Sequence, residues 1–171
     1  MQYYSTNGNA PHATLEEAVV KGLASDKGLY MPETIPSIPK AFFNHIGEMS
    51  LQDIAYVVAN TLFGQDIESD TLKEIVNDTL NFDIPLKHVA GNRYSLELFH
   101  GPTLAFKDVG ARFMARLLGH FNRKKGKLTV NVLVATSGDT GSAVANGFLN
   151  VPGVRVFVLY PKGKVSRIQE S

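Results

Sequence analysis

The second half of the chain alternates strand-forming and helix-forming segments, and this alternation constrains the fold more than any other feature. The runs 128–135 and 154–160 are rich in valine and leucine, which favours strands. Apolar residues at helical spacing predict one helix over 109–121 and another over 142–149. Alternation of this kind favours a parallel sheet with right-handed crossovers, so we expect an α/β fold.

The first half of the chain differs from the second and predicts a small mixed α+β domain. A short strand is expected over Tyr3–Ser5, and Thr14 with Glu17 has the spacing of a capping box at a helix start. Further helices are expected over 51–62 and from Ser69 or Asp70 to Leu80. The predicted buried faces contain Leu15, Ala18, Val19 and Leu23; Leu51, Ile54, Ala55, Val58 and Leu62; and Leu72, Ile75, Val76 and Leu80.

The segment 81–85 is interpreted as a linker, so we expect domains over residues 1–85 and 86–171. The second domain should open with a hairpin around residues 90–93. We expect three strands in all at the beginning of a parallel sheet. Such a sheet exposes a hydrophobic edge and face, so we expect the chain to be a piece of a longer protein.

Composition narrows the possible functions. The chain has 171 residues, a formal net charge of +1, 44% hydrophobic residues and 19% charged residues, which predicts a soluble globular protein with no nucleic-acid partner. It has no cysteine, which excludes disulfides and thiolate catalysis, and its five histidines lack metal-ligand spacing. No apolar run reaches the ~20 residues of a membrane span. The first residues lack a signal-peptide pattern, so we expect a cytoplasmic protein with no metal and no membrane contact.

Lys107 is the first candidate for chemistry. It lies in a run from His100 to Asp108 that contains glycine and proline and precedes the predicted helix. Its neighbours Leu104 and Phe106 predict partial burial. Burial and a helix N-terminus both favour the neutral amine that a Schiff base requires. The alternative is an exposed lysine near a helix start.

Asp108 follows this lysine directly and has three possible roles. It could pair with Lys107, which would hold the amine in its charged form, or cap the helix, or bond Arg112 one turn later. We prefer the last two roles. His100, at the start of the same run, is either an acid–base group or a residue that braces the loop.

The turn Ser137–Gly141 is the second candidate, because it connects a predicted strand to a helix. Ligands of open α/β sheets bind beyond the carboxyl ends of the strands. Gly138 and Gly141 allow a close approach of backbone to ligand, and a helix N-terminus favours an anion. Asp139 could accept a hydrogen bond from a cofactor or cap the helix. The alternative is a plain β–α connection, and the P-loop and GxGxxG patterns of nucleotide sites are absent.

The two candidates together predict one chemistry. A Schiff-base lysine that faces an anion-binding turn is what pyridoxal phosphate (PLP) enzymes require. Lys107 and the turn Ser137–Gly141 occur in this order and at this spacing. Lys162, Lys164 and Arg167 follow the last predicted strand and are either solvent-exposed or a clamp for a phosphorylated substrate.

Five runs of the sequence resemble the threonine synthase family, whose members are fold type II PLP enzymes. These runs are Phe99–Asp108, Thr136–Ala143, Tyr4–Asn7, Gly22–Pro32 and Tyr160–Ser166. The similarity extends along the whole chain but covers less than half of the family's usual length. It implies the family's small N-terminal domain followed by the first part of its parallel-sheet PLP domain. The residues for the cofactor phosphate and the pyridine nitrogen would lie beyond Ser171.

The resemblance also implies roles for individual residues. Lys107 would carry the cofactor as a Schiff base, and the other residues near the cofactor would be Phe106, Ser137, Gly138 and Asp139. The substrate would be held by Ser137, Gly138, Asp139, Thr140, Gly141 and Lys164. The implied reaction is a lyase step of threonine biosynthesis, the conversion of O-phospho-L-homoserine and water to L-threonine and phosphate.

Two other hypotheses remain open. The parent protein could be another type II PLP lyase or dehydratase that acts on a different amino acid or phosphorylated amino acid. This chain could also be a folding or interaction module without catalysis. We expect the 171 residues alone to be inactive even if the parent protein is an enzyme.

Overall fold

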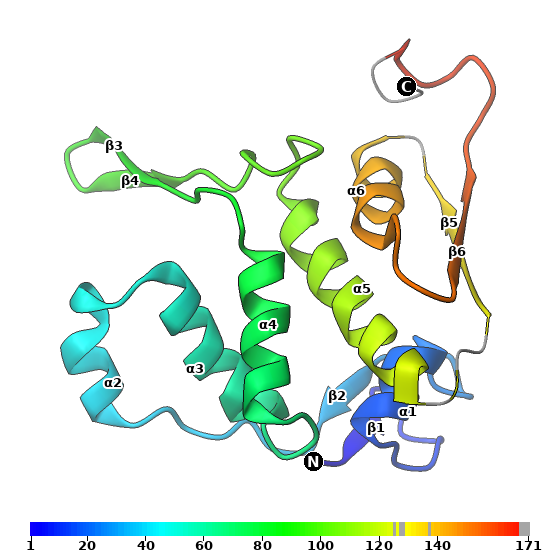
Figure 1. Ribbon diagram of the computed structural model, residues 1–171, viewed down its shortest axis with the longest axis horizontal. Coiled ribbons are helices and arrows are strands. Elements are labelled where there is room, and N and C mark those ends of the chain that lie inside the picture. Colours follow the sequence, from blue (N-terminus) through cyan, green and yellow to red (C-terminus); the bar gives the residue numbers. More distant parts are fainter. Residues whose placement is uncertain (125, 127–128, 137, 168–171) are drawn as a thin grey trace. The chain divides into compact units, whose positions relative to one another are not determined.

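The computed structural model describes residues 1–124, 126, 129–136 and 138–167 (Figure 1). The chain divides into two compact units, Met1–Asp78 and Thr79–Ser171, and each is described by itself. The domain limits 1–85 and 86–171 remain predictions of the sequence.

A small antiparallel sheet opens the first unit. Strand β1 (Tyr3–Ser5) lies where the sequence predicts it and pairs with β2 (Tyr30–Pro32), with Tyr4 opposite Met31. A further bridge joins Tyr3 to Ala13. The side chains of Tyr3 and Ser5 are buried and that of Tyr4 is exposed, which is the alternation expected of a strand with one covered face.

Helix α1 (Leu15–Lys21) begins with the predicted capping box. Thr14 Oγ1 accepts a hydrogen bond from the Glu17 N–H (3.2 Å), and Glu17 Oε2 accepts one from the Thr14 N–H (3.0 Å). The helix ends earlier than the apolar spacing suggests, because Gly22 adopts a φ of 71°. Leu23 therefore lies outside the helix and is 52% exposed, so its predicted burial is wrong.

The carboxylate of Asp26 connects the loops of the first unit. Oδ1 accepts hydrogen bonds from the Ser5 hydroxyl (2.6 Å) and the Gly28 N–H (3.0 Å), and Oδ2 accepts one from the Asn9 N–H (2.9 Å). These hydrogen bonds, that of Ser5 above all, lower the pKa of the Asp26 carboxyl. One charged side chain thus joins β1, the turn that follows it and the approach to β2.

Asp26→Asn should lower the unfolding temperature of the first unit by a few degrees at neutral pH. Because folding lowers the pKa of Asp26 below its ordinary value of 3.8, the carboxylate stabilises the fold above that pH. This contribution is lost as the pH falls through the lower, folded pKa. Thermal unfolding followed by circular dichroism should therefore show a difference from wild type that shrinks below about pH 4. Asp83→Asn, at an exposed loop position, is the control, and a pH-independent difference would contradict the prediction.

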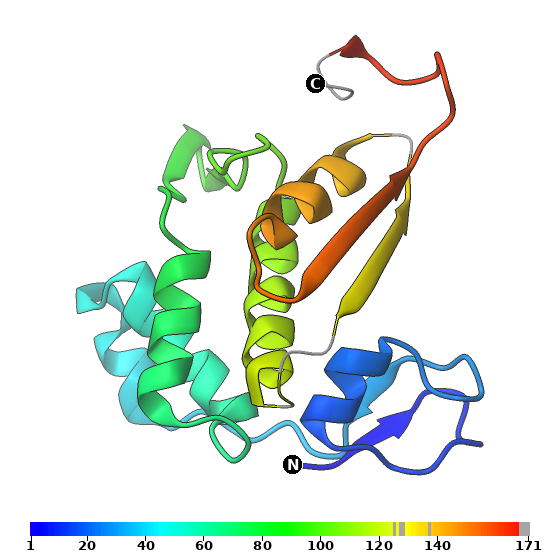
Figure 2. The same ribbon diagram turned by 45° about the vertical axis from the view of Figure 1, so that its right-hand side comes forward.

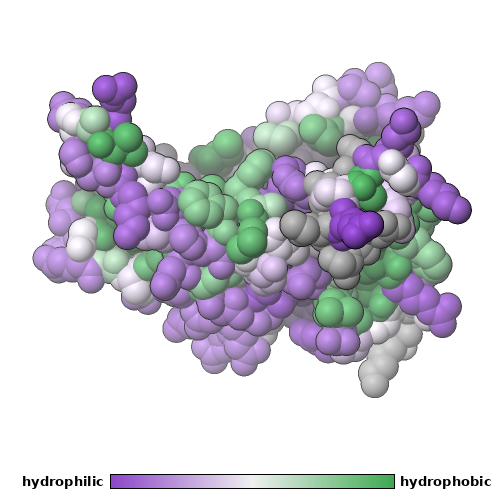
Figure 3. Space-filling model, turned by 90° about the horizontal axis from the view of Figure 1, so that it is seen from above, coloured by the Kyte–Doolittle hydropathy of each residue, from purple (hydrophilic) through white to green (hydrophobic). Residues whose placement is uncertain are grey.

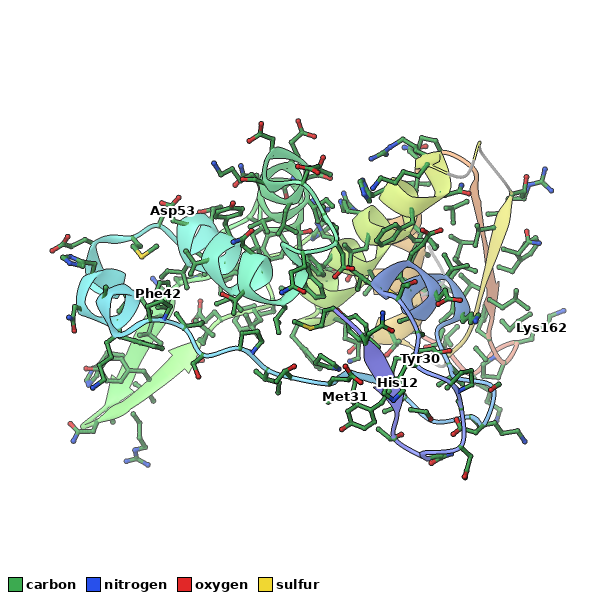
Figure 4. All side chains as sticks on the ribbon, turned by 90° about the horizontal axis from the view of Figure 1, so that it is seen from below. His12, Tyr30, Met31, Phe42, Asp53 and Lys162 are labelled. Carbon is green, nitrogen blue, oxygen red and sulfur yellow. The ribbon has the colours of Figure 1, made fainter. Side chains whose placement is uncertain are left out.

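An open hollow lies beside the β1–β2 sheet. Figure 4 shows His12 in the same part of this unit as Tyr30 and Met31. His12 Nδ1 lies 2.7 Å from Glu33 Oε1, and the two side chains are 54% and 44% exposed. An exposed pair of this kind contributes only about 0–1 kcal/mol of stability, and we assign it no chemistry. The lining residues include Tyr4, Ser5, Gly8, Ala10, His12 and Glu33.

The rest of the first unit is helical. Ser50 Oγ accepts a hydrogen bond from the Asp53 N–H (3.1 Å), and Gly64 follows the helix that Ser50 begins, as predicted. The preceding helix, which was not predicted, follows Pro39 and has no side-chain cap. The segments are α2 (Lys40–His45), the short 3-10 helix η1 (Ile46–Glu48), α3 (Leu51–Phe63) and α4 (Ser69–Thr79).

Only one of the two predicted apolar stripes is buried. In and just after α4, the predicted residues Leu72, Ile75, Val76 and Leu80 are at most 7% exposed. In α3, the predicted residues Leu51 and Val58 are 37% and 38% exposed, and Ala59 is the buried residue. An apolar stripe shows which face of a helix can be buried, but its spacing does not show whether another element covers that face.

The second unit opens with the predicted hairpin, which forms a sheet of its own. Strand β3 (Leu86–Ala90) pairs antiparallel with β4 (Arg93–Leu96), and the register shifts between His88 and Ala90. The expected three-stranded parallel sheet is therefore wrong for the described residues. In the hairpin, β3 and β4 pair with each other and form a two-stranded sheet. The parallel sheet also contains two strands.

The expected parallel pairing is confirmed for the other two strands. Strand β5 (Val130–Ala135) and strand β6 (Val154–Leu159) are in register from Val130 opposite Val154 to Ala135 opposite Leu159. Helix α5 (Lys107–Lys124) precedes β5, and helix α6 (Asp139–Phe148) connects β5 to β6. This order is the β–α–β unit that the sequence predicts.

Helices α5 and α6 pack against each other on one side of the β5–β6 sheet (Figure 2). Gly147 allows the close approach, because a Cβ at this position would lie 3.0 Å from the Ala111 carbonyl carbon. Arg116 Nη1 also donates a hydrogen bond to the Gly147 carbonyl oxygen (2.9 Å). On the other side of the sheet Leu133 and Phe157 are 69% and 49% exposed, which agrees with the hydrophobic face expected there.

Candidate active site

Lys107 is the first residue of α5, two residues earlier than the sequence predicts. Its side chain is half-buried, and Nζ lies 4.3 Å from the centroid of the Phe106 ring. The partial burial predicted for Lys107 is confirmed, although its neighbours Leu104 and Phe106 are themselves 75% and 60% exposed. The loop instead buries Ala105 (7% exposed) and Asp108, because it closes towards α5.

The exposed residues of this loop belong to a mixed surface. Phe99, like Leu104 and Phe106, is at least half exposed. Figure 3 looks down on this end of the molecule and shows apolar residues, in green, among polar residues, in purple.

The neighbours of Lys107 have partners within the second unit. Asp108 accepts hydrogen bonds from the Thr103 N–H (2.9 Å) and hydroxyl (2.6 Å). Arg112, one of its predicted partners, donates to the Thr79 carbonyl oxygen (3.1 Å), and also to the Asn81 side chain.

His100 has a partner that suits the loop-bracing role. Its Nε2 lies 2.8 Å from Glu97 Oε2, three residues earlier in the same loop. The imidazole and the carboxylate are 40% and 22% exposed. This contact fixes the path of the chain between the hairpin and the lysine.

The predicted anion-binding turn is largely the first turn of α6. Gly138 is the N-cap residue, Asp139 begins the helix, and Asp139 and Thr140 are exposed while Gly141 is buried. The helix thus starts three residues before the predicted start at Ser142. Ser137 lies outside the described residues.

Thr136, which the sequence analysis did not single out, organises this turn. Its hydroxyl oxygen accepts hydrogen bonds from the N–H groups of Gly138 (3.1 Å) and Gly141 (3.2 Å). A threonine side chain that accepts the N–H two residues later is a recurring turn motif. The signal was present in the sequence, because Thr136 directly follows a β-rich run and precedes a glycine-containing turn.

The lysine loop and the α6 turn lie at the same end of the second unit. Strands β5 and β6 are parallel, so α6 runs back against them and begins at the carboxyl end of β5. Helix α5 lies beside α6, and both begin at the edge to which the two strands point (Figures 1 and 2). This edge is where ligands of open α/β sheets bind.

The basic residues Lys162, Lys164 and Arg167 follow β6 and are exposed. The Lys164 N–H donates a hydrogen bond to the Pro161 carbonyl oxygen (3.0 Å), which forms a turn directly after the strand. The Lys162 side chain extends away from the ribbon (Figure 4). Strand β6 ends at the same edge of the sheet as β5, which is the edge where α5 and α6 begin. The three basic residues come directly after that edge in the chain.

The donor set fits PLP. An aldehyde requires a primary amine, and Lys107 supplies one that forms no ion pair among the described residues. An anionic group requires donors, and this edge carries the Thr140 hydroxyl and the exposed cations Lys162, Lys164 and Arg167. Within the described ranges no three His, Asp or Glu side chains cluster as metal ligands. No helix in the described part is long and apolar enough to cross a membrane.

Comparisons with known proteins point to one family. Residues 2–80 match the family described as "Threonine synthase N terminus". The threonine synthase of Haemophilus influenzae is 42% identical over 170 residues, and that of Escherichia coli is 37% identical over 170 residues. Each alignment covers 99% of this chain and 39% of the relative, so the chain spans about two fifths of their length.

Solved structures agree with the sequence comparisons. A PLP-bound threonine synthase from Brucella melitensis matches with a TM-score of 0.93 at 34% identity, over 99% of this chain and 38% of that one. The threonine synthase of yeast matches with a TM-score of 0.90 at 38% identity, over 99% of this chain and 37% of that one. The mixed α/β architecture predicted from the sequence is confirmed.

Proposed function

Because this chain belongs to the threonine synthase family, we propose that it supplies the catalytic lysine and the amino-acid-binding turn of an enzyme that makes L-threonine. The substrates are O-phospho-L-homoserine and water, and the products are L-threonine and phosphate. The observation that best supports this proposal is that α5, which begins with Lys107, and α6, which begins with the glycine turn, start at the same edge of the sheet.

The cofactor of the proposed enzyme is PLP, as in a fold type II enzyme. When bound, PLP withdraws electrons from the amino acid, which makes its carbon-bound protons removable. Lys107 would hold the cofactor through its amine and, as a free amine, would move protons at Cα and Cβ of the substrate. One lysine can act as both base and acid, because each step returns the proton that it took. Phe106 borders the same site.

The remaining proposed residues hold the substrate. The first turn of α6, with Gly138, Asp139, Thr140 and Gly141, binds the amino-acid carboxylate. The Thr140 hydroxyl is one donor, and the N–H groups of Gly138 and Gly141, which donate to Thr136, shape the turn. Ser137 completes this turn in the proposal. Lys164 binds the substrate phosphate, since an exposed cation at this edge suits a doubly charged group. A cytoplasmic location also remains a prediction of the sequence.

The gene product that carries this sequence, supplied with PLP and O-phospho-L-homoserine, should release threonine and phosphate in equal amounts. Amino-acid analysis and a phosphate assay measure the two products, and heat-inactivated protein is the control. A keto acid in place of threonine would favour the alternative, a PLP dehydratase or another lyase. Absence of both products would support a module without catalysis.

A further inference from the structure

A buried carboxylate closes the loop that carries the lysine. We propose that Asp108, held by Thr103, is a positioning residue that keeps the Lys107 amine free to react with the cofactor aldehyde. The inference rests on the proposed function of Lys107. Beyond that function, the pair Thr103–Asp108 controls, through its charge and its geometry, how readily the Lys107 amine reacts.

The contact has the geometry of a clamp. Asp108 has no exposed surface, and its two oxygens accept the backbone N–H (2.9 Å) and the hydroxyl (2.6 Å) of Thr103. A buried charge is tolerated only with hydrogen-bonding partners, and one residue supplies two of them here. The carboxylate therefore fixes the distance between the loop and the first turn of α5.

The loop is shaped around this carboxylate. A Cβ on Gly101 would lie 2.5 Å from Asp108 Oδ2 and 2.9 Å from Asp108 Cβ, so a larger residue than glycine would displace the clamp. Leu104 adopts a φ of 56°, which is unfavourable for leucine, while its side chain is 75% exposed. An exposed side chain gains little from packing, so packing does not explain the positive φ of Leu104. Closure of the loop between Thr103 and Asp108 does explain it.

The clamp determines the charge that the lysine meets. Asp108 directly follows Lys107, and a carboxylate free to pair with the amine would favour its protonated, unreactive form. In the described structure the carboxylate is engaged by Thr103, and no ion pair joins it to Lys107. The clamp thus holds the Asp108 carboxylate in contact with Thr103 and not in an ion pair with Lys107.

Thr103→Val tests the clamp, because valine keeps the shape of threonine and removes the hydroxyl. The probe is PLP itself, incubated with the gene product and then with borohydride. The Lys107 nitrogen bonds the aldehyde carbon and water leaves. Borohydride then adds hydride to the C=N carbon, and solvent supplies the proton to nitrogen. Peptide mapping gives the modified residue, and the reaction is followed over a range of pH.

Thr103→Val should slow modification of Lys107 about tenfold, the effect expected from one lost hydrogen bond to a charged group. The pH at which modification is half-maximal should rise, because the carboxylate, then held by the backbone N–H of residue 103 alone, can turn towards the amine. Thr103→Ser keeps the hydroxyl and should restore both the rate and the midpoint. Thr34→Val, at an exposed threonine, is the control.

The outcomes separate the two ideas. If wild-type protein is not modified at Lys107, the proposed function fails. If wild-type protein is modified and Thr103→Val matches it in rate and midpoint, the clamp is wrong. A slower reaction with an unchanged midpoint would also overturn it, since the hydroxyl would then serve only the fold. If Thr103→Val does not fold, Asp108→Asn is the second test. This change removes the charge and keeps an acceptor for Thr103, so the pH midpoint of modification should stay at or below the wild-type value. A rise in the midpoint would refute the proposal.

Discussion

Lys107→Ala should abolish the covalent attachment of PLP and strongly lower the rate of threonine formation in the gene product that carries this chain. Alanine has no amine, so the covalent bond to the cofactor cannot form. The same change removes the group that moves protons between the substrate carbon atoms. Loss of one acid–base group lowers rates by about 10²–10⁴-fold, and because this lysine also holds the cofactor, we expect at least the upper end of that range.

Two measurements test this prediction separately. The visible absorption of bound PLP reports cofactor attachment, and the threonine assay reports turnover. Lys124→Ala is the matched control, because this exposed lysine lies at the other end of the same helix. Near-wild-type absorption and turnover in Lys107→Ala would assign the chemistry to another lysine.

The sequence predicts the candidate site because its key residues are local. Lys107 and the glycine turn are recognisable as short runs, and each begins a helix whose position follows from apolar spacing. The parallel pairing of β5 and β6 then brings both helix starts to one edge. Sequence order and general rules of α/β topology are enough for this step.

Contacts that depend on the folded path of a loop were not predicted. Nothing in the run His100–Asp108 indicates that Asp108 turns back to Thr103. The apolar neighbours Leu104 and Phe106 predict partial burial of Lys107, and this lysine is half-buried, yet closure on Asp108 leaves both neighbours exposed. Hydropathy describes what a side chain prefers, whereas its exposure depends on which residue of the loop takes the space next to the helix.

The same limit applies to the fold. The capping box at Thr14 was predicted because it needs only residues four positions apart at most. The end of α1 was misplaced because Gly22, and not the apolar spacing, decides where the helix stops. The hairpin of β3 and β4 was predicted. Whether it joins the parallel sheet depends on contacts between distant segments, and the alternation of strands and helices in the sequence does not contain that information.

Gly141→Ala should disrupt the proposed substrate-binding turn. A Cβ at position 141 would overlap with the Thr136 methyl carbon and would lie 3.1 Å from Thr136 Cβ. Rotating Thr136 would relieve the overlap but would break its hydrogen bonds with the N–H groups of Gly138 and Gly141. Overpacking of this kind destabilises a protein by about 1–3 kcal/mol. Because the displaced groups begin α6, we also expect a higher KM for the substrate.

A second substitution makes the prediction specific. Thr136→Ser removes the methyl group that meets the new Cβ and keeps the hydroxyl that both N–H groups require. The double variant should therefore recover most of the free energy of unfolding, measured by urea denaturation, and most of the substrate affinity. Gly110→Ala is the control, because a Cβ there meets no atom within 4 Å and alanine favours the helix. If Thr136→Ser does not rescue Gly141→Ala, the overlap is not the cause, and the role given to Thr136 in shaping the turn is wrong.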